Sequence, residues 1–301
     1  MLSVAFVFLS AELMSRTIFP RISRIESRIR SDQREAKAIG SPVPGSAPTV
    51  LIAGNSLLLR GLDYPKLREE MAGQATVVRF GIENTEYIDW YYGLRHLFES
   101  GVRPSTVVLC LNLGQTVSSR TLGDYSARHL FGPAELLPAA HMAGMDATRT
   151  SGLILAHWSV FYASRATIRN FILNKAAPGY AEAMHALADV PVPFPPDAEL
   201  LAKANDRLKS VQELCDQYGV RLVLLIPPAV VRHNNDLLAA AAGEQHTNLD
   251  YPIPTLTVDY FADGVHLNQK GAALFTDAIA SCLRARLGNV LADQSKNLPA
   301  P

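Results

Sequence analysis

Residues 49–57 read TVLIAGNSL, and this stretch decides the fold class of the 301-residue chain. Its first part, Thr49–Ala53, is apolar and rich in β-branched residues, which is typical of a strand buried on both faces. Three similar runs occur later in the chain: Thr76–Phe80, Thr106–Leu111 and Arg221–Ile226. Helical patterns separate these runs, so the sequence predicts an α/β fold, a three-layer sandwich with a mainly parallel central sheet.

The helices between these strands carry recognisable terminal signals. Tyr87–Glu99 ends at Gly101 and Ala198–Tyr218 ends at Gly219, and glycine is the residue that most often ends a helix. A last helix is predicted over residues 269–287, with Asn268 as its N-cap. Residues 288–301 are predicted to form a disordered tail.

The composition excludes several classes of protein. Lys plus Arg number 28 and Asp plus Glu number 28, so the formal net charge is zero and a basic nucleic-acid binder is not expected. With 48% hydrophobic and 19% charged residues, the chain has enough apolar material for a large core. The three cysteines show no spacing that predicts a disulfide framework or a zinc site.

The N-terminal segment, residues 1–37, is read as a possible membrane anchor. Leu2–Ala11 is apolar but too short to span a bilayer, and it lacks the basic start and cleavage site of a secretory signal. Three interpretations compete: an anchor whose start lies upstream, an apolar helix packed on the domain, and an atypical signal.

Residues 15–37 follow with seven Lys or Arg against three acidic residues. Four isoleucines recur on one helical stripe: Ile18, Ile22, Ile25 and Ile29. Such a helix can lie on an anionic membrane surface, or it can dock its apolar stripe on the protein. We expect membrane association, with the side undetermined, and a soluble cytoplasmic protein is the alternative.

Glycine, serine and proline concentrate in residues 38–48, which are therefore predicted to link the N-terminal segment to a domain over residues 49–287. We expect everything before this linker to be dispensable to the core. The strand pattern lapses between residues 117 and 196, where a helical insertion or lid is predicted.

Two short motifs can carry chemistry. Ser56 follows the first strand, at the edge of the sheet where α/β proteins bind ligands, and is either a nucleophile or a helix N-cap. Asp263 and His266 are three residues apart just before the last helix. They are either the acid and base of a serine triad or a capping aspartate and a surface histidine.

These motifs, in this order, resemble those of the SGNH hydrolase superfamily, the GDSL esterases and lipases, including its membrane-associated bacterial members. The resemblance implies a flavodoxin-like sandwich over residues 49–287. It further implies Ser56 as nucleophile, His266 as base and Asp263 as the acid that orients it.

The resemblance also implies an oxyanion hole. Its donors would be the backbone N–H of Ser56, the side chain of Asn112, and a backbone N–H at Gly81 or Asn84. The match is incomplete, because Asn55, Cys110 and Leu113 stand where the family usually has aspartate, glycine and aspartate. Asn112 is alternatively a turn former at a strand end.

The function expected from the resemblance is a serine esterase or acyl transferase that acts on O-acyl esters, with O-acetylated carbohydrate as one substrate class. The partner would be a small-molecule or polysaccharide ester, and neither a cofactor nor a metal is predicted. The alternative is a catalytically silent module that binds a glycan or assists assembly. Four aromatic residues near the oxyanion block either pack in the core or stack on a sugar: Tyr87, Trp90, Tyr91 and Tyr92.

Overall fold

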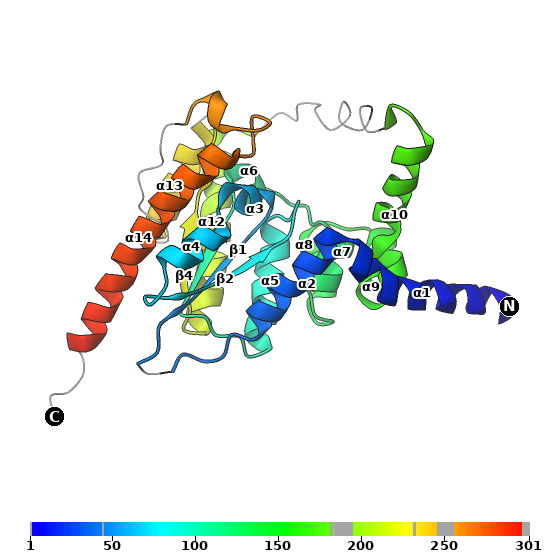
Figure 1. The fold of residues 1–301 in the computed structure, drawn as a ribbon, viewed down its shortest axis with the longest axis horizontal. Coiled ribbons are helices and arrows are strands. Elements are labelled where there is room, and N and C mark those ends of the chain that lie inside the picture. The colour runs from blue at the N-terminus through cyan, green and yellow to red at the C-terminus, as the bar shows by residue number, and fades with distance from the viewer. Residues whose placement is uncertain are drawn as a thin grey trace.

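The computed structural model describes residues 2–43, 45–180, 183, 195–230, 233–245 and 256–296. Within them, a sheet of four parallel strands has the order β2, β1, β3, β4 (Figure 1). The strands are β1 (Thr49–Gly54), β2 (Thr76–Gly81), β3 (Thr106–Cys110) and β4 (Arg221–Leu225). The prediction of an α/β fold with a parallel central sheet is confirmed.

Side chains alternate between the two faces of the sheet. On β1, Leu51 and Ala53 enter one apolar core, whereas Val50 and Ile52 enter the other. Helices cover both cores, so each strand has to be apolar on both faces. The first core is covered by α2 (Arg24–Lys37), α5 (Tyr87–Glu99) and α12 (Asp197–Gln217), and the second by α3 (Ser56–Gly61), α4 (Tyr64–Glu70) and α14 (Gln269–Lys296).

A third apolar cluster lies beside β4. It joins α6 (Leu113–Val117) and α13 (His233–Glu244) to α12. Leu224 and Ile226 enter this cluster from β4 and from the residue that follows it. The start of α6, directly after β3, is therefore fixed by packing.

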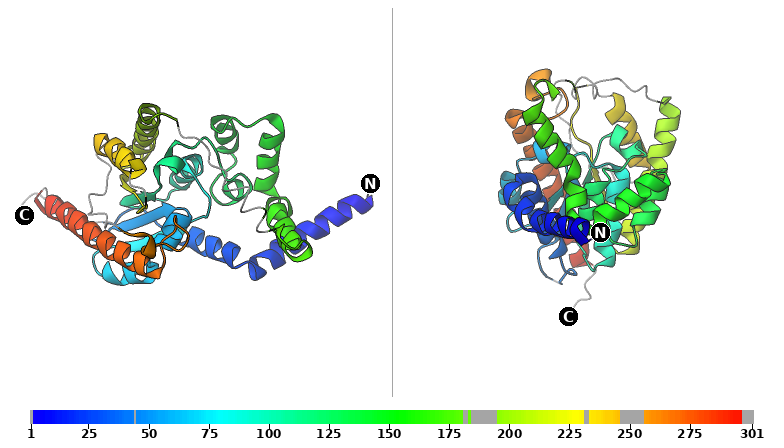
Figure 2. Two further views of the ribbon diagram at one scale, coloured as in Figure 1. Left: turned by 90° about the horizontal axis from the view of Figure 1, so that it is seen from above. Right: turned by 90° about the vertical axis from the view of Figure 1, so that its right-hand side faces the viewer.

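Between α6 and α12 the described chain is helical, as the lapse of the strand pattern predicts. The helices are α7 (Asp124–His129), α8 (Leu136–Met142), α9 (Ala147–Trp158) and α10 (Val160–Ala176). Figures 1 and 2 show them gathered at the end of the molecule nearest to the N-terminus. Residues 181–182 and 184–194 of the predicted insertion lie outside the described residues.

The N-terminal segment forms α1 (Leu2–Ile22) and α2, and α2 belongs to the core. The Ile29 side chain is 0% exposed in the first core, and Ala36 and Ile39 are buried beside it. The expectation that residues before the linker are dispensable to the core is therefore wrong. The sequence pattern missed this because Ser23 ends α1 and caps α2, which breaks the expected isoleucine stripe and leaves Ile25 50% exposed.

Among the described residues, no helix has both the length and the apolar character needed to cross a membrane.

The C-terminal part consists of a short 3-10 helix, η1 (Val258–Tyr260), and α14. Asn268 caps α14 as predicted, since its Oδ1 accepts the backbone N–H groups of Lys270 and Gly271. The helix continues to Lys296, past the predicted end at residue 287. The tail expected from residue 288 is thus helical as far as residue 296, and residues 297–301 lie outside the described residues.

Candidate active site

Ser56 lies at the carboxyl end of β1, between the ends of the neighbouring strands. Gly54 pairs with Gly81 of β2 and Cys110 of β3. A Cβ at Gly54 would stand 2.8 Å from the Cys110 carbonyl oxygen, so only glycine fits between the strands. The chain then turns into α3, whose first residue is Ser56. This places the hydroxyl at the edge of the sheet where α/β proteins bind ligands.

Asn55, and not Ser56, is the N-cap of α3. Its Oδ1 accepts the backbone N–H of Leu57 at 3.0 Å, and its Nδ2 donates to the backbone carbonyl of Thr85 at 2.8 Å. The interpretation of Ser56 as the helix cap is therefore wrong. The side chain of Asn55 is fully buried, and an ionised aspartate would have no donor for Thr85. This explains why asparagine suits the position.

A tight loop before α14 presents Asp263 and His266. The ends of the loop, Phe261 and Leu267, form an antiparallel bridge. Gly264 has a φ of +77°, a backbone conformation that favours glycine. The loop thereby turns the Asp263 carboxylate back toward His266.

Ser56, His266 and Asp263 form a continuous chain of hydrogen bonds. His266 Nε2 lies 2.9 Å from Ser56 Oγ, and His266 Nδ1 lies 2.9 Å from Asp263 Oδ2. Hydrogen bonds from the backbone and side chain of His266 lower the pKa of Asp263 to about 2. The anionic carboxylate favours a proton on Nδ1, which leaves Nε2 free to accept the proton of Ser56.

The expected oxyanion donors differ in whether each N–H group already donates to an acceptor within the protein. The backbone N–H of Gly81 donates to Asp32 Oδ2 at 3.3 Å. Among the described residues, the backbone N–H groups of Ser56 and Asn84 have no protein acceptor. Asn84 has a φ of 58°, the left-handed conformation that asparagine tolerates. Of the two alternatives for the loop donor, Asn84 is therefore the one with a free amide.

Asn112 follows β3 and caps α6. Its Oδ1 accepts the backbone N–H of Gln115 at 2.9 Å, and its own N–H donates to Gln115 Oε1 at 3.0 Å. These bonds fix the orientation of the side chain. The Nδ2 group donates to no acceptor within the described part of the chain, so it is available to a ligand.

Ser56 opens into a polar pocket of about 410 Å³. The residues that line it are Ser56, Asn84, Thr85, Glu86, Gln115, Arg120, Thr121 and Leu122. A second hollow of about 600 Å³ shares Glu86, Gln115 and Arg120 with the first and reaches Asn112. The free donors of Ser56 and Asn84 thus border the first hollow, and that of Asn112 borders the adjoining one.

The four aromatic residues near this block do not line these hollows. Tyr87, Trp90 and Tyr92 are buried in the first core, and Tyr91 packs partly against it. The Trp90 indole N–H donates to Thr85 Oγ1 at 2.9 Å, which holds the loop next to Asn84. Core packing is therefore the role of these residues.

No group of three or more His, Cys, Asp or Glu side chains that could hold a metal occurs among the described residues.

Two residues of α2 that the sequence pattern did not single out hold the loop after β2. Arg28 donates to the carbonyl of Gly81 and to Glu83 Oε2, both at 2.6 Å, and Asp32 accepts the Gly81 N–H. Asp32 also binds Arg79 with both carboxylate oxygens. The only sequence signal was an acidic residue, Asp32, inside a basic helix, and this pattern does not predict which residues Asp32 binds.

Comparison with known proteins gives little help with identity. No protein-family model and no curated protein matches the chain. A solved structure from Streptococcus pneumonia, provisionally described as a platelet activating factor, shares 13% identity over 93% of this chain and 98% of its own. The TM-score is 0.32, and a likeness this remote does not identify a family.

Proposed function

We propose that this protein is a serine hydrolase or acyl transferase of the SGNH type that acts on O-acyl esters. The observation that carries the proposal is the hydrogen-bonded chain from Ser56 through His266 to Asp263. Three donors that have no other protein partner among the described residues border two adjoining hollows: the N–H groups of Ser56 and Asn84 and the side-chain amide of Asn112. A nucleophile, a base and an oxyanion site are the parts that acyl transfer needs.

In the proposed reaction, Ser56 Oγ attacks the ester carbonyl and gives its proton to His266 Nε2. The carbonyl oxygen becomes an anion, which the three free donors stabilise. When the tetrahedral intermediate collapses, His266 returns the proton to the departing alcohol. The acyl group, now an ester of Ser56, passes to water in hydrolysis or to an acceptor hydroxyl in transfer, with His266 again taking the incoming proton.

The lining of the pocket bears on the substrate. Leu122 is the single aliphatic side chain among the described residues that line the pocket at Ser56, so an acyl chain finds little apolar surface there, and the aliphatic side chains Val117 and Leu200 belong to the adjoining hollow. Glu86, Gln115 and Arg120 offer both acceptors and donors to a hydroxyl-rich alcohol. These features favour a short acyl group on a polar alcohol, such as an O-acetylated carbohydrate.

Labelling with a fluorophosphonate probe tests the proposed nucleophile. The full chain is expected to be labelled, and both Ser56→Ala and His266→Ala are expected to lose the label while remaining folded by circular dichroism. A control variant, Ser118→Ala, removes another serine hydroxyl at the adjoining hollow and should still be labelled. Failure to label the folded wild-type chain would refute the proposal and favour a catalytically silent binding module.

Ester chain length tests the proposed substrate class. Hydrolysis of nitrophenyl acetate is expected to exceed that of nitrophenyl octanoate in kcat/KM by at least about tenfold, because several methylene groups would remain unburied. Equal or better turnover of the octanoate would contradict a short acyl group while leaving Ser56 as the nucleophile.

A further inference from the structure

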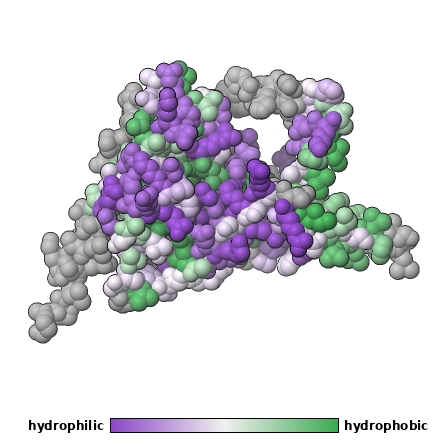
Figure 3. All heavy atoms as spheres, in the orientation of Figure 1, coloured by the Kyte–Doolittle hydropathy of each residue, from purple (hydrophilic) through white to green (hydrophobic). Residues whose placement is uncertain are grey.

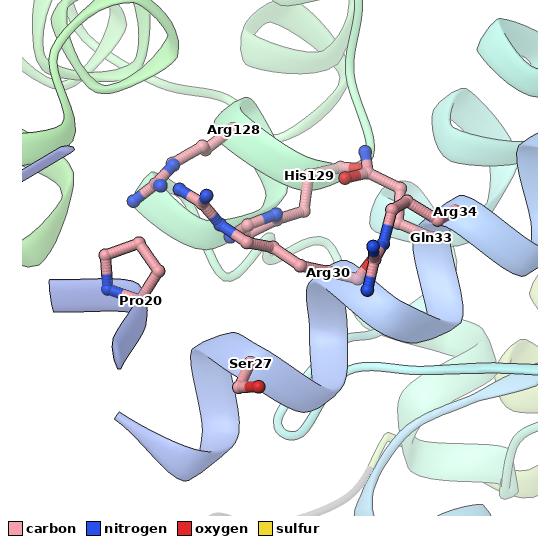
Figure 4. A pocket seen from close by; sticks show the side chains of 7 residues that line it. All are labelled: Pro20, Ser27, Arg30, Gln33, Arg34, Arg128 and His129. Atoms are coloured by element: carbon pink, nitrogen blue, oxygen red, sulfur yellow. The ribbon is translucent and has the colours of Figure 1, made fainter. Parts of the chain in front are cut away.

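Another pocket lies where α1 and α2 meet α7. It shares no residue with the two hollows of the candidate active site. Its volume is about 520 Å³. The side chains that line it come from both N-terminal helices and from the end of α7: Pro20, Ser27, Arg30, Gln33, Arg34, Arg128 and His129 (Figure 4). No residue of this pocket takes part in the proposed reaction.

Two of its arginines share one buried carboxylate. Glu26 is fully buried and accepts Arg30 Nε and Arg128 Nη2, each at 2.8 Å, and His129 Nε2 lies 3.1 Å away. Burial alone would raise the pKa of Glu26, but the hydrogen bond from His129, the positive charges beside the carboxylate and the hydrogen bond from Arg30 outweigh it and lower the pKa to about 2. Burial lowers the pKa of His129, which favours a neutral ring. One negative charge therefore faces two guanidinium groups.

Arg34 adds a third positive charge to the pocket. Its Nε donates to the backbone carbonyl of Arg30, and within the described residues it has no carboxylate partner. Three arginines against Glu26 give the pocket a formal charge of +2, which suits an anion. Figure 4 shows the side chains of Arg30 and Arg128 reaching toward each other across the gap between α2 and α7.

Helix α1, whose Pro20 lines the pocket, carries an exposed apolar surface. Four consecutive residues of α1, Phe6 to Leu9, are between 59% and 72% exposed. Successive helical residues point about 100° apart, so these side chains face all sides of the helix. Figure 3 shows this end of the molecule as hydrophobic.

This surface is held in place relative to the body of the protein. Glu12 of α1 accepts the backbone N–H groups of Val160 and Phe161 and the hydroxyl of Ser159, at the start of α10. Arg16 donates to the backbone carbonyl of Trp158. These bonds hold the middle of α1, between its apolar turns and Pro20 of the arginine pocket, against the start of α10.

We propose that this surface binds an anionic phospholipid bilayer, with a lipid phosphate in the arginine pocket and the first turns of α1 among the acyl chains. Phe8 contacts Phe161 of α10 but stays 59% exposed, and Phe6, Val7 and Leu9 are exposed around the rest of the helix. Hydrocarbon can cover all of these exposed sides, whereas a protein groove would cover one. The stretch Leu2–Ala11 carries no charged residue, so it can lie among acyl chains while guanidinium groups bind phosphate.

Vesicle flotation of the full chain tests the proposal. Equimolar phosphatidylcholine and phosphatidylglycerol vesicles are expected to bind the chain at least about tenfold more tightly than vesicles of phosphatidylcholine alone. Arg34→Ala should weaken binding to the anionic vesicles about fivefold, since one phosphate-facing charge is lost. The matched control is Arg68→Ala, an exposed arginine of α4 outside the pocket, which should bind as the wild type does.

Two further arms separate lipid from free phosphate. Leu9→Glu should weaken binding to both kinds of vesicle, because a charge would enter the hydrocarbon. Calorimetric titration with inorganic phosphate measures the pocket without a membrane. Binding of phosphate without binding of vesicles would overturn the lipid assignment. Equal binding to neutral and anionic vesicles, or equal effects of Arg34→Ala and Arg68→Ala, would overturn the role of the pocket.

Discussion

Replacing Ile29 by alanine tests whether α2 is part of the folded core. The Ile29 side chain is 0% exposed and packs in the first core between α2 and the sheet. Removing a fully buried isoleucine side chain costs about 2 to 5 kcal/mol of unfolding free energy, because apolar contacts are lost and a cavity remains. We take about 3 kcal/mol, which corresponds to a decrease in melting temperature of roughly 6 to 12 °C.

The same substitution one helical turn earlier, Ile25→Ala, is the matched control. Ile25 is 50% exposed in the same helix, so the change in helix propensity is the same but little buried contact is lost. Its expected cost is below about 1 kcal/mol. Urea unfolding of both variants, followed by circular dichroism, gives the two free energies. Similar small costs for both variants would refute the conclusion that α2 is integral to the core.

Three other predictions concern individual polar groups. Asn112→Asp keeps the oxygen that caps α6 but loses the Nδ2 donor. The kcat with nitrophenyl acetate should therefore fall about 10²- to 10³-fold. An unchanged kcat would exclude Asn112 from the oxyanion hole. Asp263→Asn should lower kcat at pH 8 about 10³- to 10⁴-fold, because the pKa of Asp263 is about 2 and its carboxylate is ionised there. A variant as active as the wild type at pH 8 would exclude Asp263 as the residue that orients His266. Burial raises the pKa of Asp89 to about 6, so the folded state binds a proton between about pH 4 and pH 6 that the unfolded chain has released. The unfolding free energy should therefore fall by up to about 1.4 kcal/mol per pH unit as the pH rises through this window, and urea unfolding of Asp89→Asn should lack this decrease. An unchanged slope in that variant would assign the pH dependence to another group.

The alternation of apolar strands with helices predicted the sheet, because a parallel strand buried on both faces has to be apolar at nearly every position. Capping residues predicted a helix end correctly where one nearby side chain binds the end of the helix, as Asn268 does at the start of α14. The last helix was predicted to end at residue 287, whereas it passes through Gly288 and continues to Lys296. A glycine lowers helix propensity without forbidding a helix.

The role of α2 could not be read from its own residues. A basic helix with isoleucines fits a membrane surface and a protein surface equally well by pattern. Its position is determined by Ile29 in the core and by Asp32, whose partners Arg79 and Gly81 lie more than forty residues away in the chain. Periodicity does not encode such distant pairings.

By itself, the sequence determined the fold class and the three residue types that could form a triad, because strand burial and short motifs are properties of neighbouring residues. Only the tertiary structure brought Ser56 within 2.9 Å of His266, and only it showed that the backbone N–H of Gly81 already donates to Asp32. The physical reason is that the availability of a backbone N–H depends on which acceptor lies near it in space. For Gly81 that acceptor is Asp32, on a helix that the sequence had assigned to a separate segment.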